Sequence, residues 1–367
     1  MILHTSRLLP ALMAAIVFGW GLADDVLAAP GKPAPVLAPS QAQKVATPPA
    51  QATPLAAGFP VIDKSKGDFT VVVLPDIQRY SLLYQPILRN QLHWAVINRE
   101  KMNIRFVTQL GDLTDKNTDE EWATVDQAFS ELDEAGLPYL VVPGNHDYDH
   151  EPWARGQKAN SDYNAVFSFY RFLHKPWYGG HFGMTNTNSF AYFEGGGVQF
   201  VVLGLEFGPG DDVLDWAKTV VKVHHYEPQQ VIMVTHAYMN SDDTRLGPGD
   251  EDMSPHKHNK LFNDGDQMWD KLVRGFDNIP IVLSGHVTTG DGAGTLISRS
   301  DKDTPVTQMM SDYQSMEQGG HGYMRLLVFR PSTQRLDVYT YSPWLDAMLE
   351  GPRQNFSVPM PIFGKRK

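Results

Sequence analysis

At residues 104–115 the chain reads IRFVTQLGDLTD, a short apolar run followed by a glycine and an aspartate. A run of this length and composition predicts a buried strand. A carboxylate just past the carboxyl end of a buried strand lies where open α/β sheets place their ligands. Asp112 is therefore the first candidate functional residue of the chain.

The same arrangement recurs on both sides of this run. Apolar and β-branched runs at 69–74 and 137–142 predict two more strands, and apolar residues at helical spacing in 83–100 and 119–135 predict the helices that connect them. Strands that alternate with helices indicate a parallel sheet with helices on its faces. The first half of the domain is thus expected to follow a β-α-β-α-β order.

A second set of strands follows. The glycines at 195–197 separate two apolar runs, which indicates a hairpin. Runs at 230–235 and 281–284 predict two strands, the first followed by His236 and the second by Gly285 and His286. Residues 293–341 alternate short strands with turns. We expect these strands to form a second sheet that packs on the first.

Oxygen or imidazole donors follow most of these predicted strands. They are Asp76, Gln78, Asp112, Asn145, His146, His236 and His286. Alone, a strand-end aspartate often caps the next helix, and a lone histidine is usually just a hydrogen-bonded polar residue. Carboxylates and histidines that converge at one sheet edge suit divalent metals such as Mn, Fe or Zn. The expected fold is α/β, with two packed mixed β-sheets flanked by helices and a metal site at the C-terminal strand ends.

The composition narrows the classes of partner and site. The formal net charge is −11, which argues against wholesale nucleic-acid binding because that needs a basic face. The chain has no cysteine, so disulfides and thiolate zinc sites are excluded. We therefore expect a small substrate and no nucleic-acid partner.

The ends of the chain differ in composition from its centre. Residues 1–29 resemble a secretory signal peptide, residues 30–66 are a Pro/Ala-rich linker, residues 67–345 are the folded domain, and residues 346–367 are a C-terminal tail. The protein is then exported to the periplasm or secreted, without stable membrane insertion once the signal is removed. The alternative is that the apolar segment is retained as an N-terminal anchor, although it is shorter than the roughly twenty residues of a membrane span.

Five motifs occur in an order that resembles the calcineurin-like metallophosphoesterases over about residues 69–290. They are Asp76-x-Gln78, Gly111-Asp112-x-x-Asp115, Gly144-Asn145-His146-Asp147, His236 and Gly285-His286. The stretches 308–313, 320–329 and 339–343 are also similar to an exported bacterial branch of that family. The resemblance implies that the two sheets pack as in a metallophosphoesterase sandwich. It also implies that the protein is an enzyme that hydrolyses phosphoric esters.

The resemblance also implies two divalent metal ions and a role for each ligand. Asp112 would bridge the two ions. Asn145, His236 and His286 would hold the second ion. Asp76 would hold the first, together with the residue at the third position of the Asp76-x-Gln78 motif.

Two motifs depart from the family pattern. The common Asp-x-His is Asp76-x-Gln78 here. The common Gly-His-x-His is Gly285-His286-Val287-Thr288 here, so Thr288 stands at the position of the second histidine. The first site then has a carbonyl oxygen from Gln78 and a hydroxyl from Thr288, and oxygen ligands suit Mg, Mn or Ca better than Zn. We expect two divalent ions of the Mn, Fe or Zn type, with the Asp76/Gln78 site the weaker.

For catalysis, the resemblance implies hydrolysis of a phosphate monoester or diester by a metal-bound water. His146 would act as general acid on the leaving oxygen, and Asp147 would orient His146. Arg79, Arg245 and His150 are candidates for contacts with a small phosphate-ester substrate, although for each a solvated loop position is an equal interpretation. The alternative function is a catalytically decayed metal-binding protein with a degenerate first metal site.

Overall fold

The computed structural model describes residues 52–55, 58–149, 160–226, 229–250 and 253–363. The predicted signal segment at 1–29 and the part of the linker before residue 52 lie outside this range. All the described residues belong to one unit of the chain, 46–367.

The strands form a sheet of eight and a sheet of seven. The first has the order β1-β15-β13-β12-β2-β3-β4, with β14 paired to β13, and the second has the order β10-β11-β9-β8-β7-β6-β5. The first sheet consists of β1 Thr53–Pro54, β2 Phe69–Leu74, β3 Ile104–Gln109, β4 Tyr139–Val141, β12 Met324–Arg330, β13 Arg335–Ser342, β14 Ala347–Met348 and β15 Phe356–Pro359. The second consists of β5 Tyr178–His181, β6 Ser189–Gly195, β7 Val198–Leu205, β8 Gln230–Thr235, β9 Ile281–Ser284, β10 Ala293–Arg299 and β11 Pro305–Ser311.

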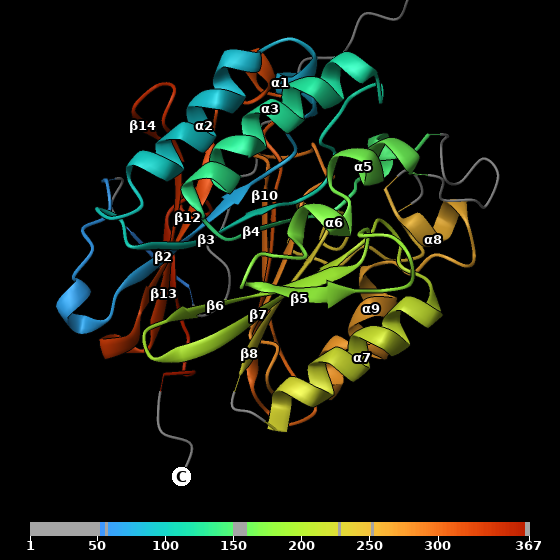
Figure 1. Ribbon diagram of the computed structural model, residues 1–367. Helices are drawn as coiled ribbons and strands as arrows, with labels where there is room; N and C mark the ends of the chain where they lie inside the picture. Colours follow the sequence, from blue (N-terminus) through green and yellow to red (C-terminus); the bar gives the residue numbers. More distant parts are fainter. Residues whose placement is uncertain (1–51, 56–57, 150–159, 227–228, 251–252, 364–367) are drawn as a thin grey trace, which may run out of the picture. The chain divides into compact units, whose positions relative to one another are not determined.

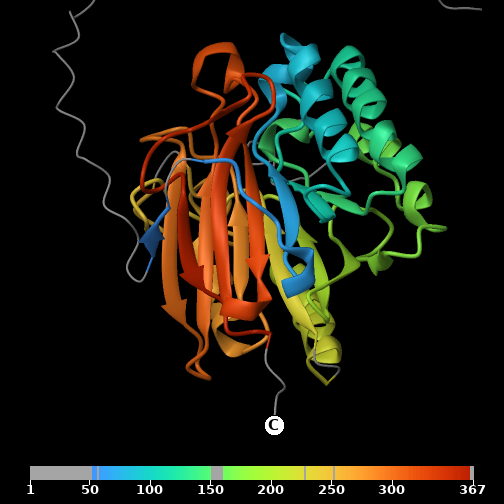
Figure 2. The same cartoon turned by 90° about the vertical axis from the view of Figure 1, so that its left-hand side faces the viewer.

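Each sheet contains both parallel and antiparallel pairs of strands. In the first sheet β2, β3 and β4 are parallel and β12 is antiparallel to β2. In the second sheet β7, β8, β9 and β11 are parallel, while β6 and β10 pair antiparallel at their sides. Figure 2 shows β2, in blue, beside the orange and red strands of the chain's end, as the β2–β12 pairing requires.

Helices cover the outer faces of both sheets. Figure 1 shows α2 and α3 on one side of the sheets and α7 and α9 on the other. The helices are α1 Gln78–Leu82, α2 Gln85–Ile97, α3 Asp119–Ala135, α5 Ser161–Val166, α6 Phe169–Phe172, α7 Asp211–Tyr226, α8 Pro255–His258 and α9 Gly265–Lys271. None of these helices combines the length and the apolar composition that a membrane span needs.

The central strands are buried on both faces, because each face packs on a different layer. In β7, Phe200 and Val202 belong to the core between the two sheets, whereas Val201 and Leu203 belong to the core under α7 and α9. Side chains of a strand alternate between its faces, so such a strand has to be apolar at every position. The expected α/β fold of two packed mixed sheets flanked by helices is confirmed.

Local signals of the sequence set the ends of α3. Thr118 accepts a hydrogen bond from the backbone of Glu121, and the Glu121 side chain in turn accepts one from the backbone of Thr118, which is a capping box. Gly136 ends the helix at φ 57°, a left-handed conformation that glycine adopts without strain. The predicted helix at 119–135 therefore has the bounds that its caps dictate.

The end of the chain is more ordered than its composition indicates. The sequence suggests a tail at 346–367, but β14 and β15 lie in that range and both pair with β13. Phe356 and Val358 are buried in the core between the layers. β15 also pairs with β1, so a short piece of the predicted linker forms the edge of the first sheet.

Candidate metal centre

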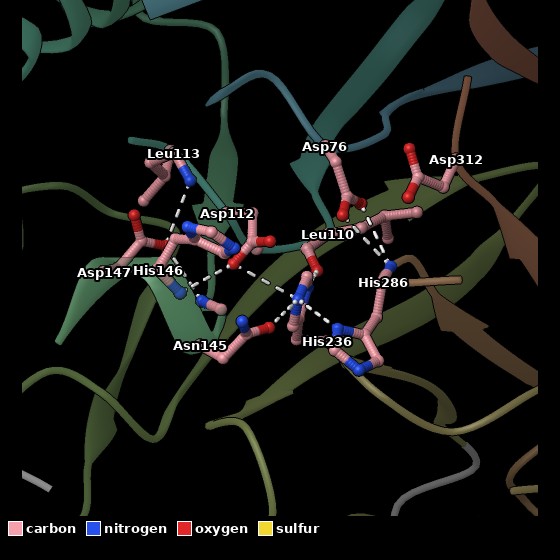
Figure 3. Close-up of polar contacts among 12 residues, drawn as sticks. Asp76, Leu110, Asp112, Leu113, Asn145, His146, Asp147, His236, His286 and Asp312 are labelled. Carbon is pink, nitrogen blue, oxygen red and sulfur yellow. Dashed lines mark hydrogen bonds and ion pairs between the residues drawn. The ribbon is translucent and has the colours of Figure 1, made fainter. Parts of the chain in front are cut away.

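Polar side chains from both sheets meet where the parallel strands end. Asp76, Asp112 and Asn145 follow β2, β3 and β4 of the first sheet, and His236 and His286 follow β8 and β9 of the second. Figure 3 shows these side chains pointing toward one another. The centre therefore spans the carboxyl edges of two sheets, and its ligands come from positions up to 210 residues apart in the chain.

Two histidines and one aspartate form the core of the centre. The possible ligand atoms of Asp112, His236 and His286 all lie within 4.8 Å of one another. His236 Nε2 lies 3.2 Å from Asp112 Oδ1 and 3.0 Å from Asn145 Oδ1. His286 Nδ1 lies 3.2 Å from the same His236 Nε2. Three possible ligand atoms thus lie within 3.2 Å of His236 Nε2.

The partners of the opposite ring nitrogens fix which atoms carry protons. His236 Nδ1 lies 2.8 Å from the carbonyl of Leu110, and His286 Nε2 lies 3.1 Å from the carbonyl of Met253. A carbonyl only accepts, so these two ring nitrogens donate and the other two, which face Asp112, carry lone pairs in the neutral rings. When both rings are neutral, the lone pairs of two nitrogens face two oxygens, and a divalent cation would satisfy that arrangement.

Burial and neighbouring charges both shift the pKa values of these groups. Burial works to raise the pKa of Asp112, but His236 and its hydrogen bond more than offset this and leave it below its usual range. Burial works to lower the pKa of His236, but Asp112 raises it. Burial and the neighbouring His236 lower the pKa of His286 to about 3. His286 is therefore a neutral imidazole at pH 7, the form that binds metals.

Three glycines precede ligands because a side chain there would collide with another ligand. A Cβ on Gly111 would contact the ring of His236, one on Gly144 would contact Asp112, and one on Gly285 would contact the carboxylate of Asp76. The glycine of each motif is thus needed for the close approach of the neighbouring strand end.

Two ligands also have an unusual backbone. Asp112 has φ 54° and His286 has φ 74°, in the left-handed region that residues other than glycine seldom adopt. Such conformations cost of order 1–3 kcal/mol each and persist where the surrounding structure enforces them. The Asp112 carboxylate accepts the backbone N–H of His146 at 3.0 Å, and the two Asp76 oxygens accept the N–H of His286 at 3.1 and 3.2 Å, so the ligands hold one another in place.

Asp147 holds the backbone of the centre. It is fully buried, and its carboxylate accepts the N–H groups of Leu113, Thr114 and Gly144 at 3.0, 2.9 and 2.8 Å. Asp147 thus holds the turn that carries His146, while Nδ1 of the His146 ring lies 2.8 Å from the carbonyl of Asp115. Burial and the charge of Asp112 raise the pKa of Asp147 to about 6.

His146 faces the open side of the centre and is not one of the clustered metal donors. Burial works to lower its pKa, but Asp112 and the Asp115 carbonyl raise it above its ordinary value. A raised pKa keeps more of the imidazole protonated near neutral pH, and the Asp112 charge that causes the shift is part of the same centre. His146 can therefore donate a proton into the space in front of Asp112.

That space is a cavity of about 280 Å³. Its walls include Gln78, Arg79, Asp112, Asn145, His146, Phe207, Met253, His286, Thr288 and Gln314. Its walls combine charged, amide and apolar groups. Gln78 is buried in this wall, and its Oε1 has no hydrogen-bond partner among the described residues. An unpartnered amide oxygen in the same cavity wall as Asp112 is available as the oxygen ligand that the sequence predicts.

The three candidates for substrate contacts have different surroundings. Arg79 lines the cavity and pairs with Asp115 at 3.2 Å, so its guanidinium lies beside the reacting space. Arg245 does not line this cavity; it stacks on the ring of Trp269 at 4.3 Å and lies 3.4 Å from Asp266, which does not support a role in substrate binding. His150 lies outside the described residues.

Two residues of the centre do not appear among the candidates from the sequence. Asp312 lies next to Asp76 in Figure 3, and the Gln314 amide lies 3.0 Å from Asp312 Oδ2 and 3.5 Å from Asp76 Oδ2. Burial, Asp312 and Asp112 raise the pKa of Asp76 well above its usual range, and burial together with Asp112 raises that of Asp312 to about 6. The signal was present, since Asp312 follows the apolar strand β11 just as Asp112 follows β3.

The chain is similar to known proteins in sequence and in fold. A family model described as calcineurin-like phosphoesterase matches residues 69–290. The uncharacterized protein YvnB of Bacillus subtilis (strain 168) is 28% identical over 320 residues, which are 82% of this chain but only 22% of that protein. A dimetal phosphatase from Danio rerio is 14% identical with a TM-score of 0.44, over 79% of this chain and 98% of that chain. A 5'-nucleotidase precursor from Thermus thermophilus is 13% identical with a TM-score of 0.40, over 80% of this chain and 54% of that chain.

Proposed function

Because the chain belongs to the calcineurin-like phosphoesterase family, we propose that it is a metal-dependent hydrolase of small phosphate esters. The observation that carries this proposal is the cluster in which Asp112 Oδ1, Asn145 Oδ1 and His286 Nδ1 each lie within 3.2 Å of His236 Nε2. With neutral rings all four of these atoms accept, and a divalent cation would provide the positive partner that the cluster then lacks.

The two proposed metal sites share Asp112. Asn145, His236 and His286 would hold one ion with imidazole and oxygen donors, and Asp76 and Gln78 would contribute oxygen donors to the other. Divalent ions bound there supply Lewis-acid chemistry, which activates water and neutralises the charge of a phosphate. We expect ions of the Mn, Fe or Zn type, with the oxygen site the weaker because it lacks imidazole ligands.

The chain's own residues provide the remaining steps. His146 donates its Nε2 proton to the oxygen of the leaving group, since Nδ1 is held by the Asp115 carbonyl. General acids of this kind contribute typically about 10²–10⁴-fold in rate. Arg79 is placed in the cavity wall to contact a phosphate oxygen, and Phe207 and Met253 provide apolar wall beside His286.

The cavity and the charge of the chain favour a small ester over a polyanion. A cavity of about 280 Å³ takes a phosphate with a modest substituent, and the net charge of −11 does not attract a nucleic acid. Both a monoester and a diester fit these limits.

The test is hydrolysis of p-nitrophenyl phosphate and bis-p-nitrophenyl phosphate, each with and without added Mn²⁺. We expect turnover that rises with Mn²⁺, and the ratio of the two rates identifies the preferred ester. The matched control is His146→Ala, which should lose turnover while it binds the same amount of metal. Metal binding without turnover on either ester or on natural phosphate esters would favour a catalytically decayed metal-binding protein.

We further propose that the protein acts outside the cytoplasm. The support is the sequence of residues 1–29, which has the charge and apolar length of a signal peptide. Expression of the full chain in a bacterium, followed by fractionation and N-terminal sequencing, tests this proposal. A cleaved N-terminus in the periplasm or medium is expected, and an intact N-terminus in the cytosolic fraction would contradict it.

A further inference from the structure

We propose that Asp312 is a ligand of the first metal ion and takes the place of the imidazoles that the family pattern puts there. The inference rests on the proposed metal-dependent function and names a further ligand of the first metal site, which departs from the family pattern. It makes that site entirely oxygen-ligated, with three carboxylates from Asp76, Asp112 and Asp312.

The topology brings Asp312 to the same level as a ligand of the second site. β11 and β9 are parallel neighbours, and Met310 is the register partner of Ser284. Asp312 and His286 each lie two residues beyond these partners, so they leave adjacent strands at the same edge. The N–H of Asp312 donates to the carbonyl of Gly292 at 3.0 Å, which fixes the turn after the strand.

The surroundings of Asp312 are those of a ligand rather than of a surface acid. Asp76 and Asp312 are each only 1% exposed, and they lie side by side in Figure 3. The hydrogen bonds that the described residues give them come from neutral groups, namely the backbone of His286 and the backbone and amide of Gln314. Two neighbouring buried carboxylates repel each other, and a cation between them would offset that cost.

Gln78 supplies an independent indication that an ion lies here. Its side chain is 3% exposed and lines the same cavity as Asp112 and Gln314. Its Oε1 is buried and accepts no hydrogen bond from the described residues. Buried amide oxygens are normally paired, so this atom is available as a ligand of an ion. Gln314 is the positioning residue, because its amide holds both carboxylates.

This donor set predicts the kind of ion. Carboxylate and amide oxygens suit Mg, Mn or Ca, whereas imidazoles suit Zn and Fe. The protein would then hold a Mn²⁺ or Mg²⁺ ion at Asp76 and Asp312 beside a more tightly held transition metal at His236 and His286. The loss of both histidines from the first site is in this view a change of metal preference rather than decay.

The experiment is Mn²⁺ binding to the metal-free protein, measured as stoichiometry by equilibrium dialysis and as magnetic coupling by electron paramagnetic resonance. The wild type should bind two ions per chain and show the spectrum of a coupled pair. Asp312→Asn and Asp312→Ala should bind one ion tightly, weaken the other at least ~10-fold, and show an uncoupled spectrum. The control Glu317→Gln removes the same charge from an exposed site in the same loop and should behave as the wild type.

A further substitution of Asp312 distinguishes a direct metal ligand from a residue that only positions Asp76. Asp312→His would return an imidazole to the first site and shift its preference from Mn²⁺ toward Zn²⁺, which a positioning residue would not do. Thermal unfolding of each metal-free variant checks the fold. Two coupled Mn²⁺ ions in both Asp312→Asn and Asp312→Ala would overturn the proposal.

The same measurements distinguish failure of this inference from failure of the proposed function. If the variants lose one ion but no ester is hydrolysed by the wild type, the assignment of Asp312 stands and the proposed reaction fails. If the wild type hydrolyses esters and Asp312→Ala still binds two coupled ions, the reaction stands and the assignment fails.

Discussion

The metal centre has two halves that lie on the same edge of the two sheets but offer different donors. The histidine half consists of Asn145, His236 and His286, and the carboxylate half consists of Asp76, Gln78 and Asp312. Both halves draw residues from both sheets. The position of a residue at a strand end therefore fixes where a ligand lies, while its chemical type alone fixes which ion it prefers.

The halves also differ in how they are stabilised without metal. In the histidine half, the carbonyls of Leu110 and Met253 hold the rings with their lone pairs inward. In the carboxylate half, the neutral amide of Gln314 lies between two acids that repel each other. The histidine half is thus preorganised, whereas we expect the carboxylate half to take its final geometry only with a cation bound.

The largest effect is expected from a change in the one ligand common to both halves. Asp112→Asn keeps the shape of the side chain but removes the charge that would bridge the ions. We expect turnover to fall on the order of 10³-fold, since the electrostatic contribution of bound metals is worth several kcal/mol. Steady-state rates measured with dialysed and with Mn²⁺-saturated protein test this. Full activity of the variant at saturating Mn²⁺ would show that Asp112 is not a shared ligand.

Staged removal of metal should separate the halves. A weak chelator is expected to take the ion of the carboxylate half at a concentration about 10-fold lower than that needed for the histidine half, a difference of ~1.4 kcal/mol. Metal content measured across a chelator series should show two steps. A single step that removes both ions together would contradict the asymmetry between the halves.

Most residues of the centre could be predicted from the sequence, but not all of them. Asp112, Asn145 and His236 could be found because each follows an apolar run that is locally recognisable as a strand. Asp312 follows such a run too, but its importance depends on the parallel pairing of β11 with β9, which no local pattern reports. A pairing between strands distant in sequence is a property of the whole fold.

Two other expectations depended on side-chain direction, which spacing does not give. Arg245 lies near His236 in sequence, yet its guanidinium stacks on Trp269 because an aromatic face and a neighbouring carboxylate offer it a closer site. Asp147 neighbours His146, yet its buried carboxylate is already occupied by the backbone N–H groups of the turn, including that of Gly144.

A steric change can strain the carboxylate half selectively. A Cβ at Gly285 would collide with the carboxylate of Asp76, so Gly285→Ala should lower the free energy of unfolding by about 1–3 kcal/mol and weaken the first ion. The matched control is Gly275→Ala, where a Cβ meets nothing within 4 Å. Urea unfolding of both variants with Mn²⁺ titration checks this. Equal stability and equal metal binding in the two variants would contradict the packing described here.

The smallest expected effect comes from making the halves alike. Gln78→His replaces the unpartnered amide oxygen with an imidazole, as in the common family motif. Because imidazole suits Zn²⁺ better than an amide oxygen does, the affinity of the first site for Zn²⁺ relative to Mn²⁺ should rise by about 10-fold, or ~1.4 kcal/mol. Competition between the two ions, followed by metal analysis after dialysis, gives this ratio. The control is Gln314→His at the neighbouring amide, which lines the same cavity but holds the carboxylates as a hydrogen-bond donor. If both substitutions shift the preference equally, the amide of Gln78 is not a ligand, and the difference between the halves then arises from their charge rather than from that position.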